Sequence, residues 1–314
     1  ITTKPIHFAR PPPWLIHFSK FVIILLLRRN LMILIDYSGI AIAPVVMGAV
    51  AADDLDMIRH MILNSIRMYR QKFKQYGEVV VVADAGGNWR KEVYPQYKVK
   101  RNKNREESKI DWDIAFANIN KIYDEIGENF PYKTIKQWGC EADDSIAEIV
   151  KWTQEFGNHE EIMIVSSDKD FKQLQKYSNV HQFSPIIKKL IKVDDPHLTQ
   201  LEHFITGDPG DGVPNCLSPD NSFADGIKQN TLTAKKKAAL MEDPKSLGDE
   251  VYRNYLRNKK MIDLTENSEC PENIKKEIIN KFVEQDPRDN KKKVMNYFIV
   301  NKCRNLLSEI GDFI

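Results

Sequence analysis

The sequence has few cysteines, no histidine motif and no long hydrophobic run, and each absence excludes a class of protein. Its four cysteines stand far apart, without a Cys-x-x-Cys pair or a histidine at zinc-ligand spacing. Neither a disulfide framework nor a structural zinc site is therefore expected, and we interpret the cysteines as reduced and structural. The seven histidines form no motif either, so each is predicted to be a surface or core residue rather than a catalyst.

Long apolar segments are also missing. The apolar run at residues 21–27 is far shorter than the roughly 20 residues that a membrane span needs. It is not followed by a convincing small-residue cleavage site, so a signal peptide is not supported. We expect a cytoplasmic globular protein whose domain starts at Met32, with residues 1–31 as an extension or upstream read-through outside the fold.

Net charge is nearly absent, because 46 Lys and Arg residues stand against 44 Asp and Glu residues. The distribution along the chain says more than this sum. Acids cluster after apolar runs, whereas bases gather at residues 90–109 and in the C-terminal third. Such a pattern is typical of a metal-using enzyme that acts on a polyanion.

Three short apolar runs are typical of buried β-strands, and an aspartate follows each of them: residues 32–35 and Asp36, residues 79–83 and Asp84, residues 162–165 and Asp168. Between the first two runs, apolar residues recur at steps of three and four over residues 55–76, which predicts an amphipathic helix ended by Gly77. Strands that alternate with helices predict an α/β fold with a mostly parallel central sheet flanked by helices. Because the carboxyl ends of parallel strands share one edge, we expect the three aspartates to meet there.

An aspartate after a strand is also ordinary loop chemistry, since it caps helices and forms turns. For any one of the three this structural role is the better interpretation. The combination with other acids favours a site. These further acids are Glu141, Asp143 and Asp144, then Asp170 beside Asp168, and finally Asp208 and Asp211 in a glycine-rich turn.

The additional acids have structural alternatives of their own. Acids in a first helical turn complement the helix dipole, which is a strong alternative for Asp144. Glu141 and Asp143 are two residues apart and can point together only if Glu141 lies in the turn that leads into the helix. If all the acids converge, their mutual repulsion must be offset by hard divalent cations such as Mg²⁺. Many of these acids would then orient metal-bound water rather than bind the ion directly. Two ions about 3.5–4 Å apart could activate water and stabilise a leaving oxygen, so no nucleophilic side chain is required.

Five sequence blocks, taken together, resemble the 5′ nuclease superfamily. They are LIDYSG at 34–39, VVVADAGGNWRKEVYPQYKVKR at 80–101, EADDSIA at 141–147, SSDKDF at 166–171 and GDPGD at 207–211. EADD followed by SSDxDF is the most specific joint signal. The resemblance extends from Met32 onward and is strongest to the T-even-type phage ribonucleases H, relatives of flap endonucleases and of the 5′ nuclease domain of bacterial DNA polymerase I. It implies a 5′ nuclease or PIN-like fold.

The resemblance also implies a site for two Mg²⁺ ions, with Mn²⁺ as a substitute. The family's metal-site motifs fall on Asp36, Asp84, Glu141, Asp143, Asp144, Asp168, Asp170, Asp208 and Asp211. Among these, the predicted catalytic carboxylates are Asp36, Asp84, Asp143 and Asp168. The family places a base near the scissile phosphate after the second strand, and Arg90, Lys91 and Lys98 are candidates among which the sequence does not choose.

Bases and aromatic residues alternate between residues 89 and 109. Bases neutralise phosphates, and aromatic rings stack on unpaired nucleobases for about 1–3 kcal/mol each. The predicted nucleic-acid contacts are Arg90, Lys91, Tyr94, Tyr97, Lys98, Lys100, Arg101 and Lys103. The alternative is a solvated mobile loop, and both hold if the loop becomes ordered around a displaced 5′ strand. The resemblance implies that this segment forms an arch over the active site.

The pattern after residue 200 is helical. Helices are predicted at residues 235–241, 251–264, 273–282 and 291–307. We predict a catalytic domain over residues 32–200 and a helical duplex-binding region over residues 201–314. The lysine triplets at 235–237 and 291–293 are equally well explained as duplex contacts and as solvated helix faces.

The favoured function is a replication nuclease that removes RNA primers and adjacent DNA from the 5′ end of strands paired to a template. Its substrates would be RNA–DNA hybrids and nicked or flapped duplex DNA. A single-strand-binding protein or a sliding clamp would be its partner, and we expect a monomer in the cytoplasm of a phage-infected or bacterial cell. The alternatives are a PIN-type single-strand ribonuclease, which would be shorter, and an inactive nucleic-acid-binding relative, which would have lost motif acids. The sequence does not separate RNA from DNA preference, or exonuclease from flap-cutting action.

Overall fold

The computed structural model describes residues 31–157, 159–266, 268–287 and 291–314. The predicted extension therefore lies outside the described residues, apart from Leu31. The first strand begins at Met32, as the sequence predicts.

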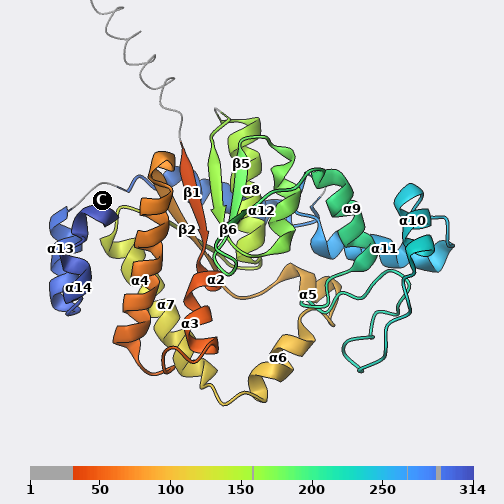
Figure 1. Ribbon diagram of the computed structural model, residues 1–314, viewed down its shortest axis with the longest axis horizontal. Coiled ribbons are helices and arrows are strands. Elements are labelled where there is room, and N and C mark those ends of the chain that lie inside the picture. The colour runs from red at the N-terminus through yellow and green to blue at the C-terminus, as the bar shows by residue number, and fades with distance from the viewer. Residues whose placement is uncertain (1–30, 158, 267, 288–290) are drawn as a thin grey trace, which may run out of the picture.

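A six-stranded sheet forms the centre of the protein (Figure 1). Its strands stand in the order β3 (Lys133–Gln137), β2 (Glu78–Asp84), β1 (Met32–Asp36), β4 (Ile162–Val165), β5 (Val180–Ser184), β6 (Lys189–Ile191). All neighbours are parallel except β5 and β6. The mostly parallel α/β fold is thus confirmed, and the three strands predicted from the sequence are β1, β2 and β4.

The chain builds this sheet outward from β1 in two directions. It first adds β2 and β3 on one side and then returns to place β4 and β5 on the other. The order therefore reverses between β1 and β4, and such a switch point leaves a crevice at the carboxyl ends of the strands. Asp36 ends β1 and Asp168 follows β4, so two of the predicted acids flank this crevice.

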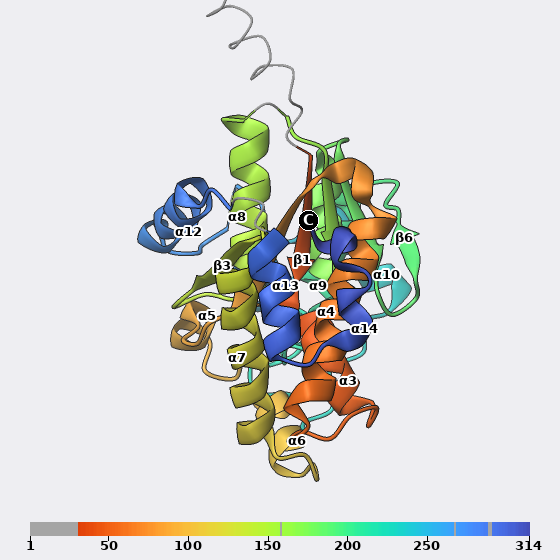
Figure 2. The same ribbon diagram turned by 90° about the vertical axis from the view of Figure 1, so that its left-hand side faces the viewer.

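Both faces of the sheet are buried. Along β1, Ile33 and Ile35 face one core, whereas Met32 and Leu34 face the other. The first core is covered by α4 (Leu55–Lys72), α7 (Trp112–Asn129) and α13 (Lys291–Val300). The second is covered by α8 (Ala142–Glu155), α11 (Asp249–Ile262) and α12 (Glu272–Glu284), and Figure 2 shows α12 beside α8.

The C-terminal region is helical but does not stand apart from the sheet. Its first part continues from α9 (Pro196–Thr206), which includes the predicted boundary at residue 200, to α10 (Ala234–Glu242) and α11. Its last part returns to the sheet, where α12 and α13 cover opposite cores. The prediction of a single helix at residues 291–307 is wrong. A turn with Lys302 at φ 54° separates α13 from α14 (Arg304–Leu307).

The prediction of a loop at residues 89–109, after β2, is also wrong, because most of this segment is helical. It contains α5 (Trp89–Val93) and α6 (Val99–Glu106), separated by a turn. Lysine, arginine and glutamate are good helix formers, and they outweigh the asparagines within α6. In Figure 1, α6 runs below the carboxyl edge of the sheet toward α7.

Candidate functional site

Hydrogen bonds hold Asp36 and Asp84 at the crevice. The Ser166 hydroxyl donates to Asp36 Oδ2 at 2.8 Å, and the Gly39 N–H donates to Oδ1 at 3.2 Å. The Ser38 hydroxyl and the Ala142 N–H both donate to Asp84 at 2.8 Å. These bonds join the ends of β1, β2 and β4 to the start of α8, so the backbone fixes where the two carboxylates point.

Asp143 and Asp168 complete a group of four carboxylates, which we call the open acids: Asp36, Asp84, Asp143 and Asp168. Within the described residues, no lysine, arginine or histidine nitrogen forms an ion pair with any of them. Burial and the charge of Asp84 raise the pKa of Asp36 to about 6. Burial, Asp168 and Asp36 raise the pKa of Asp143 well above its usual range. The open acids are therefore close enough to repel one another.

Glu141 and Asp211 lie next to the open acids but are neutralised by bases. Lys98 forms an ion pair with Glu141 and lies 3.6 Å from Asp211, whose other oxygen accepts from Arg101 at 2.6 Å. The Tyr97 hydroxyl lies within 2.7 Å of Glu141 and 2.9 Å of Asp211. Burial alone would raise the pKa of Glu141, but Lys98 and Arg90 lower it to about 2. Glu141 is the N-cap of α8, so it lies in the turn that leads into the helix, where the sequence requires it to be.

A third group contains a residue that the sequence analysis missed. His203, at the end of α9, has its ring between Asp170 and Asp208. Burial, Asp168 and Asp208 raise the pKa of Asp170, whereas His203 and Lys169 outweigh burial and lower the pKa of Asp208. No motif includes this histidine, so the only available signal was its position one helical turn before the GDPGD block.

Arg90 and Asp144 pair with each other beside Glu141, whose Oε2 lies 3.7 Å from Arg90 Nη1, and their predicted roles stay predictions. They form a bidentate ion pair with distances of 2.6 and 2.9 Å, and only 2% and 1% of their surfaces are exposed. Arg90 Nε also donates to the Met261 carbonyl at 2.7 Å. We therefore interpret this pair as a link between α5, α8 and α11, with Asp144 occupied by arginine rather than free for a cation.

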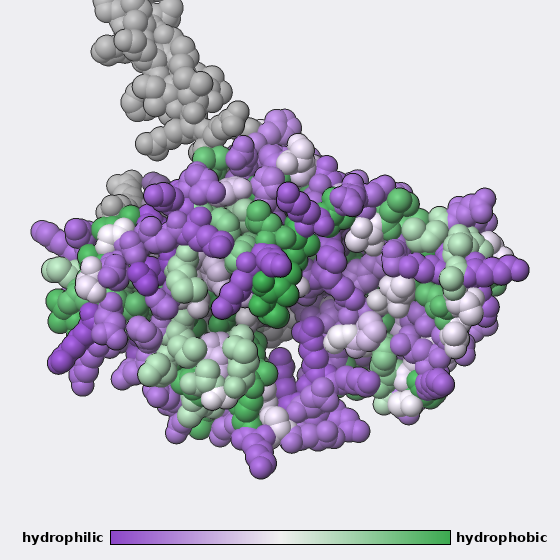
Figure 3. Space-filling model, in the orientation of Figure 1, coloured by the Kyte–Doolittle hydropathy of each residue, from purple (hydrophilic) through white to green (hydrophobic). Residues whose placement is uncertain are grey.

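Two arginines of α6, Arg101 and Arg105, line a hollow beside the acids. The hollow has a volume of about 300 Å³, and its walls include Asp84, Lys91, Arg101, Arg105 and Glu141. Lys100 and Lys103 are exposed on the same helix. Figure 3 shows the surface hollowed between the sheet edge and α6, with largely hydrophilic residues around it. A backbone phosphate is a chemical match for these bases.

The aromatic residues of this segment are not available for stacking. Trp89, Tyr94 and Tyr97 are all at most 4% exposed and belong to the second core. Because these rings are buried, the structure does not support their predicted contact with nucleobases. The exposed ring at this edge is instead Trp138, which is 69% exposed and lies against Gly86 and Gly87. A Cβ atom on Gly86 would come within 2.7 Å of this ring, so the glycine is what lets the ring lie there.

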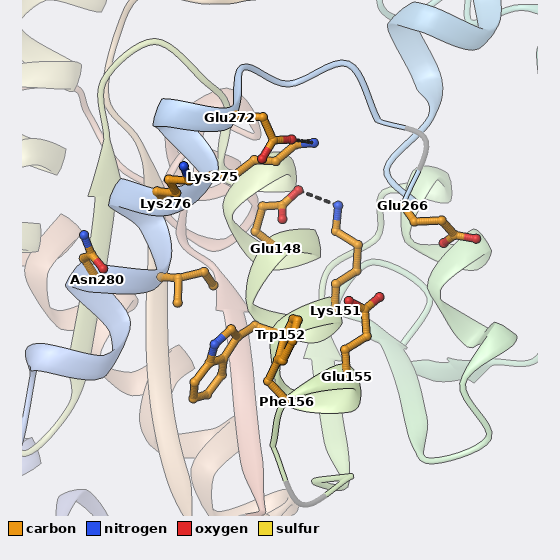
Figure 4. Close-up of a pocket in the computed structure, with 11 residues that line it drawn as sticks. Glu148, Lys151, Trp152, Glu155, Phe156, Glu266, Glu272, Lys275, Lys276 and Asn280 are labelled. Carbon is orange, nitrogen blue, oxygen red and sulfur yellow. Dashed lines mark hydrogen bonds and ion pairs between the residues drawn. The ribbon is translucent and has the colours of Figure 1, made fainter.

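Another hollow, of about 360 Å³, lies between α8 and α12 (Figure 4). Two of its three lysines have acidic partners within the same wall, because Lys151 pairs with Glu148 and Lys275 pairs with Glu272. Four glutamates line this hollow, so its walls lack the surplus of bases found in the hollow beside α6. The chemistry is expected at the crevice and not here.

Two family models and two known proteins match this chain. Residues 50–201 match the family described as 5′-3′ exonuclease, N-terminal resolvase-like domain, and residues 195–313 match the family described as T4 RNase H, C terminal. The ribonuclease H of Enterobacteria phage T4 is 32% identical over 297 residues, which cover 89% of this chain and 95% of that protein. A 5′-3′ exonuclease of Mycoplasmopsis pulmonis is 29% identical over 211 residues, covering 62% of this chain and 66% of that protein.

Solved structures show the same fold. The D15 protein of phage T5, co-crystallised with metal ions, has a TM-score of 0.56 at 16% identity and is matched over 89% of this chain and 98% of that one. A T5 5′-exonuclease with bound zinc has a TM-score of 0.57 at 18% identity, over 87% of this chain and 100% of that one.

Fold and sequence together define a nuclease, a phosphodiester hydrolase of the 5′-3′ exonuclease class. Within that class the chain belongs to the family of the phage T4 ribonuclease H. In the part of the chain that the structure describes, no helix has the length and apolar character needed to cross a membrane.

Proposed function

We propose that this protein is a metal-dependent 5′ nuclease that hydrolyses phosphodiester bonds at the 5′ end of RNA or DNA paired to a template, and so removes RNA primers and adjacent DNA during replication. The observation that carries this proposal is the set of open acids beside a helix of exposed bases. Such a site places unneutralised carboxylates next to groups that bind phosphate. The proposal extends to this chain what the names of its relatives describe.

The residues of the crevice fit divalent cations. The four open acids offer oxygen ligands without competing protein cations. Burial and the charges of neighbouring carboxylates raise the pKa values of Asp36 and Asp143, and a cation would offset that repulsion. Divalent ions held there would lower the pKa of a water molecule and offset the charge that develops on the phosphate and the leaving oxygen. Mg²⁺ is our proposal for the ion, since the open acids supply only oxygen.

The remaining residues of the site bind and orient the substrate. Arg101 and Arg105 line the hollow beside Asp84 and would neutralise phosphates of the strand that enters under α6. Lys98 is the candidate for the base nearest the scissile phosphate, because Arg90 is buried with Asp144 and Lys91 is exposed at the outer wall. Trp138 provides an exposed ring on which a nucleobase at the edge of the site could stack.

Cleavage of 5′-labelled substrates tests this function. A paired RNA–DNA hybrid, a nicked duplex and a 5′ flap are compared with unpaired RNA in the presence of Mg²⁺, for the wild type and for Asp168→Asn. We expect short 5′ products from the paired substrates and none with the variant. Cutting of unpaired RNA alone would instead support a PIN-type ribonuclease, and no cutting by the wild type would support an inactive binding protein. The exposed residue Asp194 offers the matched control Asp194→Asn, which should cut like the wild type.

A further inference from the structure

The group formed by Asp170, His203 and Asp208 has the layout of a mixed nitrogen and oxygen metal site. One ligand atom from each of the three residues can be chosen so that all lie within 4.8 Å of one another. His203 Nδ1 lies 3.2 Å from Asp170 Oδ1, and its Nε2 lies 3.5 Å from Asp208 Oδ2. The three residues come from three segments, namely the 3₁₀ helix Lys169–Lys176, the end of α9 and the turn that follows Gly207.

Two buried polar atoms of this group lack a hydrogen-bond partner among the described residues: Asp170 Oδ1 and His203 Nε2. Asp170 is only 8% exposed, so this carboxylate lies away from bulk solvent. An unsatisfied buried polar group is costly, and an ion is one of the ordinary explanations for it. A cation bound among these three side chains would remove that cost.

The surroundings orient the Asp208 carboxylate, and its basic neighbour Lys169 is partly exposed. Asp208 Oδ1 accepts the backbone N–H of Gly210 at 2.8 Å, which orients Asp208 Oδ2 toward His203. Lys169 lies 3.3 Å from that same Oδ2, but its side chain is 43% exposed. Lys169 can therefore leave Asp208 for solvent when a cation arrives, without burying an unpaired charge.

We propose that a ring nitrogen of His203 binds a divalent ion together with Asp170 and Asp208, and that this position selects Mn²⁺, Co²⁺ or Zn²⁺ over Mg²⁺. Imidazole nitrogen binds these transition-metal ions more readily than it binds Mg²⁺, which prefers oxygen ligands. The two ends of the acidic edge would then differ in metal preference, since the open acids offer oxygen alone. This inference rests on the proposed function in one respect, namely that the edge binds metal ions.

Manganese binding to the full-length wild type provides a test that does not depend on activity. Electron spin echo spectroscopy of the Mn²⁺-loaded protein should show coupling to a histidine nitrogen, and labelling histidine with ¹⁵N should change the coupling pattern. His203→Asn should abolish the coupling, whereas His197→Asn, an exposed position on the same helix, should retain it. Absence of nitrogen coupling in the wild type would overturn the proposal, and so would its persistence in His203→Asn. The wild-type and isotope measurements remain decisive even if the variant does not fold.

Metal titration by calorimetry tests the selectivity. We expect His203→Asn to weaken the tightest Mn²⁺ binding by at least about 10-fold and to leave Mg²⁺ binding within about 3-fold of the wild type. Equal losses for both ions would show that His203 acts on charge alone, which would contradict the proposed selectivity. The outcome is separable from the proposed function: cleavage in Mg²⁺ that depends on Asp168, without nitrogen coupling, would leave the nuclease intact and remove only the role of His203.

Discussion

The acidic edge contains two kinds of carboxylate that differ in what neutralises them. The open acids have no ion-pair partner among the described residues, and the pKa values of Asp36 and Asp143 are raised. Asp144 and Glu141, on the same helix terminus as Asp143, are paired with Arg90 and Lys98. A buried carboxylate with a cation supports the fold, whereas one without a cation costs stability until an ion binds. Residues within one EADD motif therefore have opposite tasks, which the following experiments separate.

The largest effect is expected for the paired acids. Arg90→Ala leaves Asp144 buried without its cation, which should lower the free energy of unfolding by about 3–5 kcal/mol. Denaturant unfolding of the metal-free protein measures this loss. Replacing both partners together, as Arg90→Leu with Asp144→Leu, should recover much of it because no charge remains unpaired. A single variant as stable as the wild type would show that the link between α5, α8 and α11 is not structural.

The second prediction concerns an open acid. Asp168→Asn should reduce turnover at least about 100-fold in saturating Mg²⁺, because it removes a charged ligand or a group that positions water. The metal-free variant should be as stable as the wild type or about 1 kcal/mol more stable, since the remaining carboxylates repel less. Asparagine still caps the helix that begins at Lys169, where Asp168 accepts the N–H of Asp170 at 2.9 Å.

Cleavage rates and melting temperature in chelator are measured together for that variant. A destabilised but active Asp168→Asn protein would mean that Asp168 has a structural role like that of the paired acids, and it would contradict the proposed division into open and paired acids.

The third prediction concerns the bases of α6. Replacing Lys100 and Lys103 by alanine should weaken substrate binding and reduce the slope of log affinity against log salt by roughly 0.7–0.9 for each phosphate that the variant no longer neutralises. Folding should be unaffected, because no residue of α6 is buried. The matched control removes Lys235 and Lys236, which are exposed on α10. If both variants changed the slope of log affinity against log salt equally, the bases of α6 would contribute no more to substrate binding than those of α10.

The smallest effect is a pH dependence of the metal-free protein. The pKa of Asp36 is raised from 3.8 to about 6 in the folded state, so folding favours the protonated form. The stabilising effect of that proton is complete below the unfolded pKa and is lost as the pH rises through about 6. The melting temperature of the wild type should therefore fall relative to that of Asp36→Asn between pH 4 and 6, where thermal scans in chelator compare the two. Parallel curves would mean that Asp36 is not among the strained carboxylates.

The sequence predicts the middle of the sheet better than its margins. The strands β1, β2 and β4 are continuous apolar runs because both of their faces are buried. By contrast, β3 reads KTIKQ and β6 reads KLI. Polar residues at the partly buried positions of β3 and at an exposed position of β6 weaken the apolar signal. The prediction of a loop at α6 is wrong for a related reason, since a helix with no buried residue has no apolar stripe to reveal it.

The site was predicted as a set of acids, but their division into open and paired groups was not. That division depends on which base reaches which carboxylate across long stretches of chain, as with Arg101 and Asp211. The same limit explains His203, whose partner Asp170 meets it only through tertiary packing. The assignment of individual residues to metal ions, and of clamp or single-strand-binding partners, stays a prediction.

The return of the C-terminus to the first core has a consequence for synthesis on the ribosome. Phe298 and Phe313 pack around Phe130, and Arg70 donates to the Asp312 carbonyl at 2.8 Å, so residues near the end of the chain complete a core begun by β1. A nascent chain cannot close this layer until Phe298 and Phe313 have been translated, and it exposes apolar surface meanwhile. We therefore expect stalled or C-terminally truncated chains to be bound by chaperones and degraded, even when every residue of the acidic edge is already present.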